Sequence, residues 1–364
     1  MTKVSGPKHH SHIKATFAEP TDKKHPDRKI LDQVVQMIKD TPKGATIRAA
    51  IHSLSDNKVQ HALQDAHKRG VHVVVVQDGK NKRSDDPSGK ELAKTLNTPN
   101  KFGEKGTNVW GKDGAITSDK SGIMHSKLML FSQTKVDGVE TKDVSWFGSA
   151  NFTGQTGAKT FNNALTVADD KNLYKGFKDY FHDLSEKKHV KGNDYFDGHG
   201  RGAGHGDKVK FHASPDANHD PVAKILNDIK PKGAEVLVDQ AMIFNSRGNL
   251  VKKLADLKAH GADVKVVANN IHADMRRELR EAHIPVSIAK THDKTIAINA
   301  DLKSDKGHDK TKMVVTGSHN WTKSANTKND ELLVSVKDDR LFNQYKDHFQ
   351  TAFKQGDRVG KKGD

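Results

Sequence analysis

The sequence predicts an α/β protein made of two similar halves, each a mixed, mainly parallel sheet flanked by helices, with a shared site between them. Helices that end at glycine are followed by short Val-rich runs, which is the pattern of βαβ units. The same order of elements occurs twice along the chain. A short polar motif also recurs once in each half.

The first half begins with an amphipathic helix. This helix starts at residues 29–31 and ends at the Pro-Lys-Gly of residues 42–44. A strand is expected over 45–51, a second helix over 59–69 and a continuous buried strand over 71–76. These elements predict one βαβ unit.

The second half repeats this order. Residues 224–226 begin a helix that ends at the Pro-Lys-Gly of 231–233, and a strand follows over 234–238. A second helix is expected over 250–260 and a second strand over 264–268. The repetition indicates two copies of one unit.

The chain of 364 residues is too long for one ordinary core. We predict four parts: an N-terminal extension (1–28), a first half (29–192), a Gly- and His-rich linker (193–206) and a second half (207–364). Residues 81–121, rich in Gly, Asp, Lys and Asn, predict a long surface loop in the first half.

Composition limits the partners. The chain has 61 basic and 46 acidic residues, a net charge of +15, which favours nucleic acid, an anionic lipid surface or a phosphate-bearing substrate. A solvated surface with scattered charges is the alternative interpretation. The absence of cysteine excludes disulfides, thiolate metal sites and a cysteine nucleophile.

Targeting signals are not evident. No stretch approaches the ~20 apolar residues of a membrane span. Residues 1–20 contain basic and His residues but no apolar core of a signal peptide. The compartment therefore stays open between the cytoplasm and secretion after removal of a signal.

The most specific feature is a repeated polar motif. His125-Ser-Lys127 leads into an apolar run, and G-S-A-N-F-T follows from residue 148. His292-Asp-Lys294 leads into a second run, and G-S-H-N-W-T follows from residue 317. The two histidines are 167 residues apart and the two asparagines 169, an offset that indicates duplication. The candidate catalytic residues are His125, Lys127, Asn151, His292, Lys294 and Asn320.

These residue types suit a phosphodiester. In a strand, residues i and i+2 share a face, so each His and Lys project together. One imidazole can attack phosphorus while the other protonates the leaving oxygen. Two ammonium groups and two Asn amides stabilise the charge on the phosphate oxygens, so the site needs no metal and no cofactor. We also expect Ser149, Ser318 and Trp321 to contact the substrate.

This arrangement resembles the phospholipase D superfamily, whose H-x-K-x4-D signature occurs in each half and is followed by G-[GS]-x-N. The resemblance covers most of the chain. It implies His125 as nucleophile, through a covalent phosphohistidine, and His292 as general acid and base. The Asp of the signature is Ser132 in the first copy and Asn299 in the second. Tyrosyl-DNA phosphodiesterases also lack it, so the departure weakens the lipase-like match more than the catalytic interpretation.

The superfamily also places an acidic or amide residue after the Asn, where it holds an imidazole Nδ1. Glu331 matches in the second half and would contact the first-half histidine across the pocket. In the first half the same count along the chain gives Asn162, whereas local similarity gives Ala164. The partner of His292 is therefore open between Asn162, Asn163 and no residue.

Three functions fit the motifs. The one we prefer at this point is hydrolysis or transfer of the headgroup phosphodiester of a glycerophospholipid, with an anionic membrane surface as a further contact. The alternative is a nuclease or DNA-adduct phosphodiesterase, supported by the +15 charge and an aromatic content of 6%. The third is a non-catalytic, polyanion-binding protein. We expect a monomer with no obligate protein partner, because both half-sites lie in one chain.

Two sequence features separate lipid from nucleic acid. A lipase should expose apolar residues around the pocket, for which residues 241–244 are the candidate, although we favour a buried position for them. A nuclease should line a groove with basic side chains. The candidates for this groove are Lys80, Lys82 and Arg83, or Arg276, Arg277 and Arg280.

Overall fold

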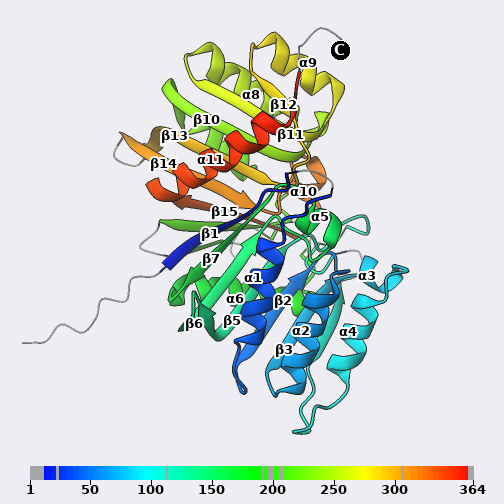
Figure 1. The fold of residues 1–364 in the computed structure, drawn as a ribbon. Coiled ribbons are helices and arrows are strands. Elements are labelled where there is room, and N and C mark those ends of the chain that lie inside the picture. The colour runs from blue at the N-terminus through cyan, green and yellow to red at the C-terminus, as the bar shows by residue number, and fades with distance from the viewer. Residues whose placement is uncertain are drawn as a thin grey trace, which may run out of the picture.

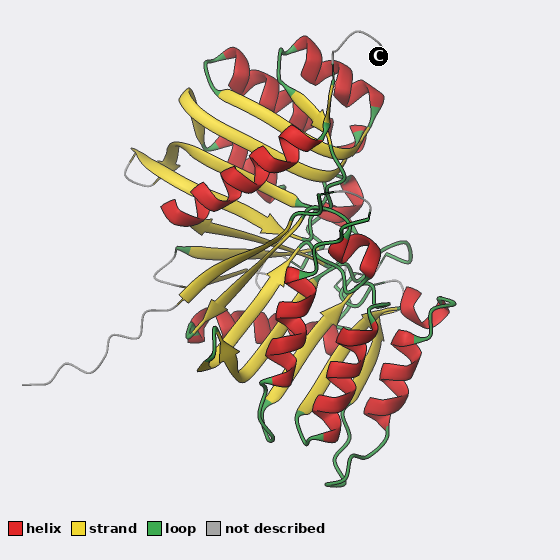
Figure 2. Ribbon diagram, in the orientation of Figure 1, coloured by secondary structure: helices red, strands yellow, loops and turns green. Residues whose placement is uncertain are grey.

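The structure is a computed structural model that describes residues 12–21, 24–111, 114–117, 119–190, 192, 194–195, 201–204, 208–304 and 307–359. It shows two mixed sheets, one in each half of the chain, flanked by helices (Figure 1; Figure 2). The predicted α/β fold with two similar halves is confirmed.

The first sheet has seven strands in the order β1-β7-β6-β5-β2-β3-β4. These strands are β1 (His12–Ala18), β2 (Thr46–Ile51), β3 (His72–Asp78), β4 (Thr107–Gly111), β5 (Lys127–Val136), β6 (Val139–Gly148) and β7 (Asn162–Ala168). The helices of this half are α1 (Lys29–Lys39), α2 (Asn57–Lys68), α3 (Lys80–Arg83), α4 (Ser88–Asn97), α5 (Gly154–Ala158) and α6 (Lys171–Ser185).

The second sheet has nine strands in the order β16-β12-β11-β10-β13-β14-β15-β9-β8. These strands are β8 (Arg201–Gly204), β9 (Val209–Ser214), β10 (Ile229–Ile243), β11 (Asp263–Ile271), β12 (Val286–Ile288), β13 (Lys294–Ser304), β14 (Gly307–Gly317), β15 (Glu331–Lys337) and β16 (Asp357–Arg358). The helices are α7 (Pro221–Asn227), the 3₁₀ helix η2 (Asn245–Arg247), α8 (Gly248–Ala259), α9 (Ala273–Glu281), α10 (Lys323–Thr327) and α11 (Asp339–Gln355).

The prediction that each sheet is mainly parallel is wrong. Only β2-β3-β4 and β10-β11-β12 pair in parallel, and the other neighbours in both sheets are antiparallel. The strand that follows each H-x-K motif turns back on itself as a hairpin. In β5–β6 a two-residue turn, Asp137-Gly138, has positive φ at both positions, which is the geometry that closes an antiparallel hairpin.

Two further expectations differ from the structure. Residues 81–121 are not a simple loop, because they contain α4 and β4, and β4 adds a third parallel strand beside β3. Helix α7 ends at Asn227, before the Pro-Lys-Gly, because β10 already begins at Ile229. The Pro-Lys-Gly lies within β10 instead, where the register shifts between Lys230 and Glu235.

Strands also lie inside the segments that we assigned to the extension and the linker. β1, within residues 1–28, is the edge strand of the first sheet and pairs with β7. β8, within residues 193–206, pairs with β9 at the edge of the second sheet. None of the helices that the structure describes has the length and apolar character needed to cross a bilayer.

The halves share a central core. Helices α1, α2 and α4 cover the outer face of the first sheet, and α7, α8 and α9 cover the outer face of the second (Figure 1). Between the sheets lie α6, which packs on β6 and β8, and α11, which packs on β13, β14 and β1. Each of these two helices therefore contacts strands of both sheets. Their side chains, including Phe177, Tyr180, Tyr345 and Phe349, form one apolar cluster that joins the halves.

Backbone hydrogen bonds join the halves where the motif strands begin. The His125 N–H donates to the carbonyl of Asp330 (3.0 Å), and the His292 N–H donates to the carbonyl of Phe161 (2.8 Å). In the other direction, the Asp330 N–H donates to the carbonyl of Ile123, and the Phe161 N–H donates to the carbonyl of Lys290, both at 2.9 Å. The first motif is therefore fixed to the residue before β15 of the second half, and the second motif to the residue before β7 of the first half.

An ionic contact holds the second motif from behind. His348 of α11 contacts Asp293 through Nε2 (2.8 Å) and Glu19 through Nδ1 (2.6 Å), and both His348 and Asp293 are buried. Burial alone would lower the pKa of His348, but the carboxylates of Asp293 and Glu19 raise it to about 10. The ring is therefore an imidazolium that ties α11 and the segment after β1 to the H-D-K motif.

Replacing His348 by Gln should destabilise the protein by about 3 kcal/mol, because it leaves the buried Asp293 carboxylate without a counter-charge. Since the pKa of His348 is raised from about 6.5 to about 10, this contribution is complete below about pH 6.5 and is lost as the pH rises through 10. Urea unfolding of wild type and variant at pH 6 and pH 9 measures it. A difference that grows with pH would contradict this assignment.

Candidate active site

The two half-sites are built from the same three places in each half. The histidine lies just before the first hairpin strand (β5 or β13), and the lysine is its first residue. The asparagine follows the second hairpin strand (β6 or β14), and the orienting residue opens the next strand (β7 or β15). Because these strand ends meet at one edge of each sheet, the motifs converge.

His125 is oriented by a carboxylate from the opposite half. Its Nδ1 lies 2.8 Å from Oε2 of Glu331, and the histidine is only 6% exposed. Glu331 is fully buried and accepts hydrogen bonds from the Ser318 hydroxyl (2.5 Å) and the Asn329 amide (3.1 Å). A carboxylate only accepts here, so Nδ1 carries the proton and Nε2 is left to face the pocket.

His292 is oriented by neutral groups. Its Nδ1 contacts the carbonyl of Ser149 (3.0 Å) and Oδ1 of Asn162 (3.2 Å), so this ring also carries its proton on Nδ1. Of the alternatives left open by the sequence, Asn162 is the one that contacts His292. Asn163 points elsewhere, accepting a hydrogen bond from the Tyr345 hydroxyl (2.9 Å).

The two lysines are buried beside the histidines. Lys127 is 2% and Lys294 1% exposed, and each ammonium group donates to the carbonyl of the histidine in its own motif. Burial lowers the pKa of Lys294 to about 7 and that of Lys127 well below its usual range. An anionic phosphate between these groups would favour the charged form of both lysines.

The same crowding acts on the imidazoles. Burial, and then the nearby lysines, lower the pKa of His125 and of His292 well below the ordinary value. Each ring is affected by a charge from the opposite half: the ammonium group of Lys294 lowers the pKa of His125, and that of Lys127 lowers the pKa of His292. The two half-sites therefore form one electrostatic unit.

Each of the two asparagines is buried and has a side-chain oxygen without a hydrogen-bond partner in the protein. Asn151 donates from Nδ2 to the Thr156 hydroxyl (3.0 Å), while Oδ1 of both Asn151 and Asn320 has no protein partner. Rotating either amide by 180° exchanges its oxygen and nitrogen at almost no change in shape. In that orientation the Thr156 hydroxyl can donate to Asn151 Oδ1, and the amide N–H groups are free for an oxyanion.

The three residues that we expected to contact the substrate have other contacts in the structure. Ser149 and Ser318 are fully buried, and their hydroxyls donate to the orienting residues Asn162 (3.0 Å) and Glu331 (2.5 Å). They position other side chains instead. Trp321 is 1% exposed and packs in the apolar core of the second half, not at the rim of the pocket, because its backbone bridges to β10.

One residue near the site escaped the sequence reasoning. The His52 ring lies edge-on to the His125 ring, with centroids 4.5 Å apart. His52 directly follows β2, and a polar residue after the carboxyl end of a parallel strand is the signal that marks such positions. The internal repeat does not mark it, because Ala241 stands at the matching place in the second half.

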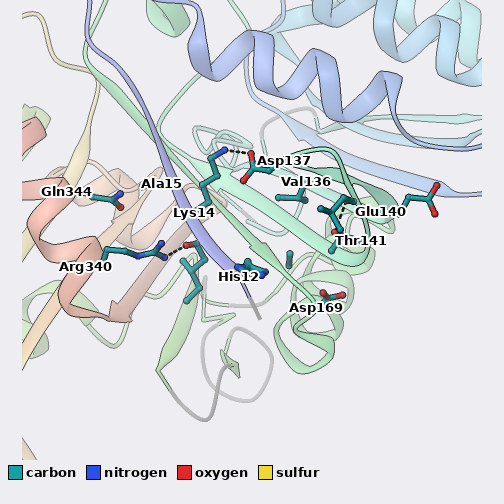
Figure 3. A pocket seen from close by; sticks show the side chains of 13 residues that line it. His12, Lys14, Ala15, Val136, Asp137, Glu140, Thr141, Asp169, Arg340 and Gln344 are labelled. Carbon is teal, nitrogen blue, oxygen red and sulfur yellow. Dashed lines mark hydrogen bonds and ion pairs between the residues drawn. The ribbon is translucent and has the colours of Figure 1, made fainter. Parts of the chain in front are cut away.

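One cavity and two polar clusters lie apart from the His, Lys and Asn side chains of the motifs. A cavity of about 710 Å³ lies between β1, the far end of the β5–β6 hairpin and α11, where Lys14 pairs with Asp137 (Figure 3). Two groups have metal-ligand spacing in the described part of the chain: Asp194, Asp216 and His219, and Asp239, Asp293 and His348. In the second group the imidazolium of His348 already donates from both nitrogens, which explains the cluster as an ionic contact.

Two α/β halves that meet at paired His-Lys-Asn motifs define a phosphoryl-transfer fold of the phospholipase D type. A family model described as "Cardiolipin synthase, PLD-like domain" matches residues 34–185 and 226–353. The chain belongs to this family, within the phospholipase D superfamily. No curated protein matches the chain in a sequence search.

Several solved structures resemble this fold. A phosphatidylserine synthase from Haemophilus influenzae Rd KW20 has a TM-score of 0.64 at 10% identity, covering 95% of this chain and 87% of that one. A polyphosphate kinase from Porphyromonas gingivalis has a TM-score of 0.56 at 12% identity, covering 94% of this chain. This chain spans only 50% of that kinase. The phospholipase D family member Nuc from Salmonella typhimurium, at 26% identity, covers 42% of this chain with a TM-score of 0.34.

Replacing Glu331 by Gln should disturb the tautomer of His125. A glutamine amide can donate to Nδ1, which moves the ring proton to Nε2, and the loss of such an orienting carboxylate costs on the order of 10²–10⁴ in kcat. Long-range ¹H–¹⁵N spectra of the histidine rings measure the tautomer. In the matched variant Asn162→Ala, His292 should keep its tautomer through the Ser149 carbonyl. An unchanged His125 signal in Glu331→Gln would disprove this role.

Proposed function

We propose that the chain is a phosphodiesterase that cleaves a P–O ester through a covalent phosphohistidine on His125. The observation that carries this proposal is the contact between His125 Nδ1 and the buried Glu331 carboxylate (2.8 Å). An imidazole that bonds to phosphorus becomes positively charged, and a carboxylate on its other nitrogen stabilises that charge. His292 has only neutral partners, so it fits the role that exchanges a proton.

In the first step, Nε2 of His125 attacks phosphorus and the bond to the leaving oxygen breaks. The protonated Nε2 of His292 gives its proton to that oxygen, so the leaving group departs as an alcohol. Lys127, Lys294 and the amides of Asn151 and Asn320 stabilise the charge on the remaining phosphate oxygens. These side chains supply the cations that a bound metal supplies in other phosphodiesterases.

In the second step, neutral His292 takes a proton from a water molecule, whose oxygen attacks phosphorus. The P–N bond breaks, and its electron pair returns to Nε2 of His125. An alcohol in place of water gives transfer to a new ester by the same route. We propose hydrolysis as the main reaction.

For the substrate, the described surface supports nucleic acid over a glycerophospholipid, against our preference from the sequence. Ala241 and Ile243, in the segment that a lipase would be expected to expose, are buried, which is the position that we favoured from the sequence. The large apolar side chains recorded as exposed among the described residues are Phe102 and Val139. Val139 lies at the far end of the β5–β6 hairpin, and Lys43 covers the ring of Phe102 at 3.5 Å, so neither forms an acyl-chain surface beside the motifs.

The direct test is an assay in EDTA on single-stranded DNA, double-stranded DNA, phosphatidylcholine vesicles and bis(p-nitrophenyl) phosphate. We expect cleavage of single-stranded DNA and of the small diester, and a loss of at least about 10³-fold in His125→Ala. Enzyme quenched in alkaline detergent should carry a base-stable, acid-labile phosphoryl group that the variant lacks. Activity on vesicles alone would reject the nucleic-acid substrate, and wild type no better than His125→Ala would reject catalysis.

The rate should follow a bell-shaped pH profile with its optimum below about pH 6.5. His125 must be neutral to attack and His292 protonated to donate, and the pKa of both rings is lowered from the usual value of about 6.5. Activity should therefore fall as the pH rises through the pKa of His292, which loses its proton. Measuring kcat/KM for the small diester from pH 4 to 9 tests this. An optimum above pH 7.5 would contradict it.

A further inference from the structure

A basic group next to the first motif belongs to neither half-site. Lys80 and Arg83 of α3 line a cavity of about 540 Å³ together with hydroxyl and amide side chains, among them Ser53, Ser55 and Thr153. Thr153 ends the G-S-A-N-F-T element that contains Asn151. The cavity is therefore lined in part by the same element that carries Asn151.

His52 connects this cavity to the motif. Its Nδ1 lies 3.1 Å from the carbonyl of Met124, and a carbonyl only accepts, so Nδ1 carries the proton. Its Nε2 is then an acceptor and receives a hydrogen bond from the Lys80 ammonium group at 2.8 Å. The same ring makes a T-shaped contact with the His125 ring, so a single imidazole lies between the Lys80 charge and His125.

Lys80 is fixed in this position by its backbone as well. Oδ1 of Asp78 accepts from the Lys80 N–H (2.9 Å), and Oδ2 accepts from the Met124 N–H (2.9 Å). One buried carboxylate thus ties the start of α3 to the residue before His125. The ammonium group of Lys80 uses one of its three N–H donors on His52, which leaves two for a ligand.

The acidic groups nearby are engaged. Asp86 is the acid among the residues lining the cavity, and its carboxylate accepts from the N–H of Ser88 (2.9 Å). Asp78 makes the two backbone contacts described above. Arg83 is exposed at the cavity. The group of Lys80, Arg83 and the neutral His52 therefore presents positive charge and N–H donors at the cavity.

In the described part of the second half, the position that corresponds to His52 holds no polar side chain. Ile51 pairs with Lys127 in the first sheet, and Gln240 pairs with Lys294 in the second. The residues that follow Ile51 and Gln240 therefore correspond in the repeat, and they are His52 and Ala241. Ala241 has no side chain that can hold a cation. Binding beside the pocket is therefore asymmetric, and it lies on the side of His125.

We propose that Lys80 and Arg83, with His52 as the bridge to the motif, form a subsite for the phosphate that neighbours the scissile phosphodiester in a single strand of nucleic acid. This proposal rests on the proposed function only for the identity of the substrate. A strand carries a phosphate on each nucleotide, so a second anion site one ring away from His125 fixes its register in the pocket. A glycerophospholipid with a single phosphodiester has no second phosphate to place there.

The test is binding of a fluorescent 12-nucleotide single strand, measured by anisotropy at several salt concentrations. Lys80→Met and Arg83→Met should each weaken binding about tenfold and lower the slope of log affinity against log salt by about 0.7, the value for one phosphate contact in a single strand. Arg277→Met, with the same charge change on α9, the helix that follows β11 in the second half, should match wild type. Arg83 is exposed, so its variant removes charge without opening the core.

The subsite is overturned if the three variants bind alike, or if wild type binds anionic phospholipid vesicles but not the strand. Thermal unfolding of Lys80→Met shows whether weaker binding comes from the lost contact or from loss of the fold. If Lys80→Met does not fold, the binding of Arg83→Met decides whether the subsite exists. His125→Ala should bind the strand while losing turnover. Wild type that binds but does not cleave would reject the proposed function and leave the subsite standing, so the two failures are distinguishable.

Discussion

The backbone bridges from His125 to Asp330 and from His292 to Phe161 determine which side chain of the opposite half orients each imidazole. Asp330 directly precedes Glu331, just as Phe161 directly precedes Asn162. Once a bridge forms, the next side chain along the strand has to face the opposite half's imidazole. The orienting contacts are therefore consequences of backbone pairing between halves, and neither half can complete its own half-site.

The middle residue of each H-x-K motif anchors the strand from the other face. Ser126 turns away from the pocket and bonds the Tyr180 hydroxyl of α6 at 2.7 Å, and Asp293 turns away and pairs with His348 of α11. Alternation along a strand explains both, since the residue between His and Lys must face the central core. The two helices between the sheets thus support the site directly, one by a neutral contact and one by an ionic contact.

The two-residue period of a strand and the repetition between the halves were enough to find the histidines, lysines and asparagines of the two motifs. The side-by-side projection of His125 and Lys127 follows from the strand period. An equal count along both halves gave Asn162 as one of the alternatives for the partner of His292, and the structure selects it. Sequence could not show that β5 folds back as a hairpin, because a buried strand reads the same in parallel and antiparallel sheets. Nor could it place Trp321, whose burial depends on a bridge to β10. The sequence also did not point to His52, because the second half has no matching histidine that would mark it as part of the repeat.

Two of the differences between the halves fall on the same imidazole, that of His125. A duplicated fold gives each half a histidine, a lysine and an asparagine, and such a pair would be chemically equivalent if nothing else differed. Glu331 supplies a negative charge behind His125, where the second half has the neutral Asn162 behind His292. His52 and Lys80 lie beside His125, where the second half has Ala241. The carboxylate favours positive charge on that ring and the ammonium group favours an anion next to it. Both asymmetries therefore favour His125 as the ring that holds the phosphoryl group, and His292 as the ring that moves the proton.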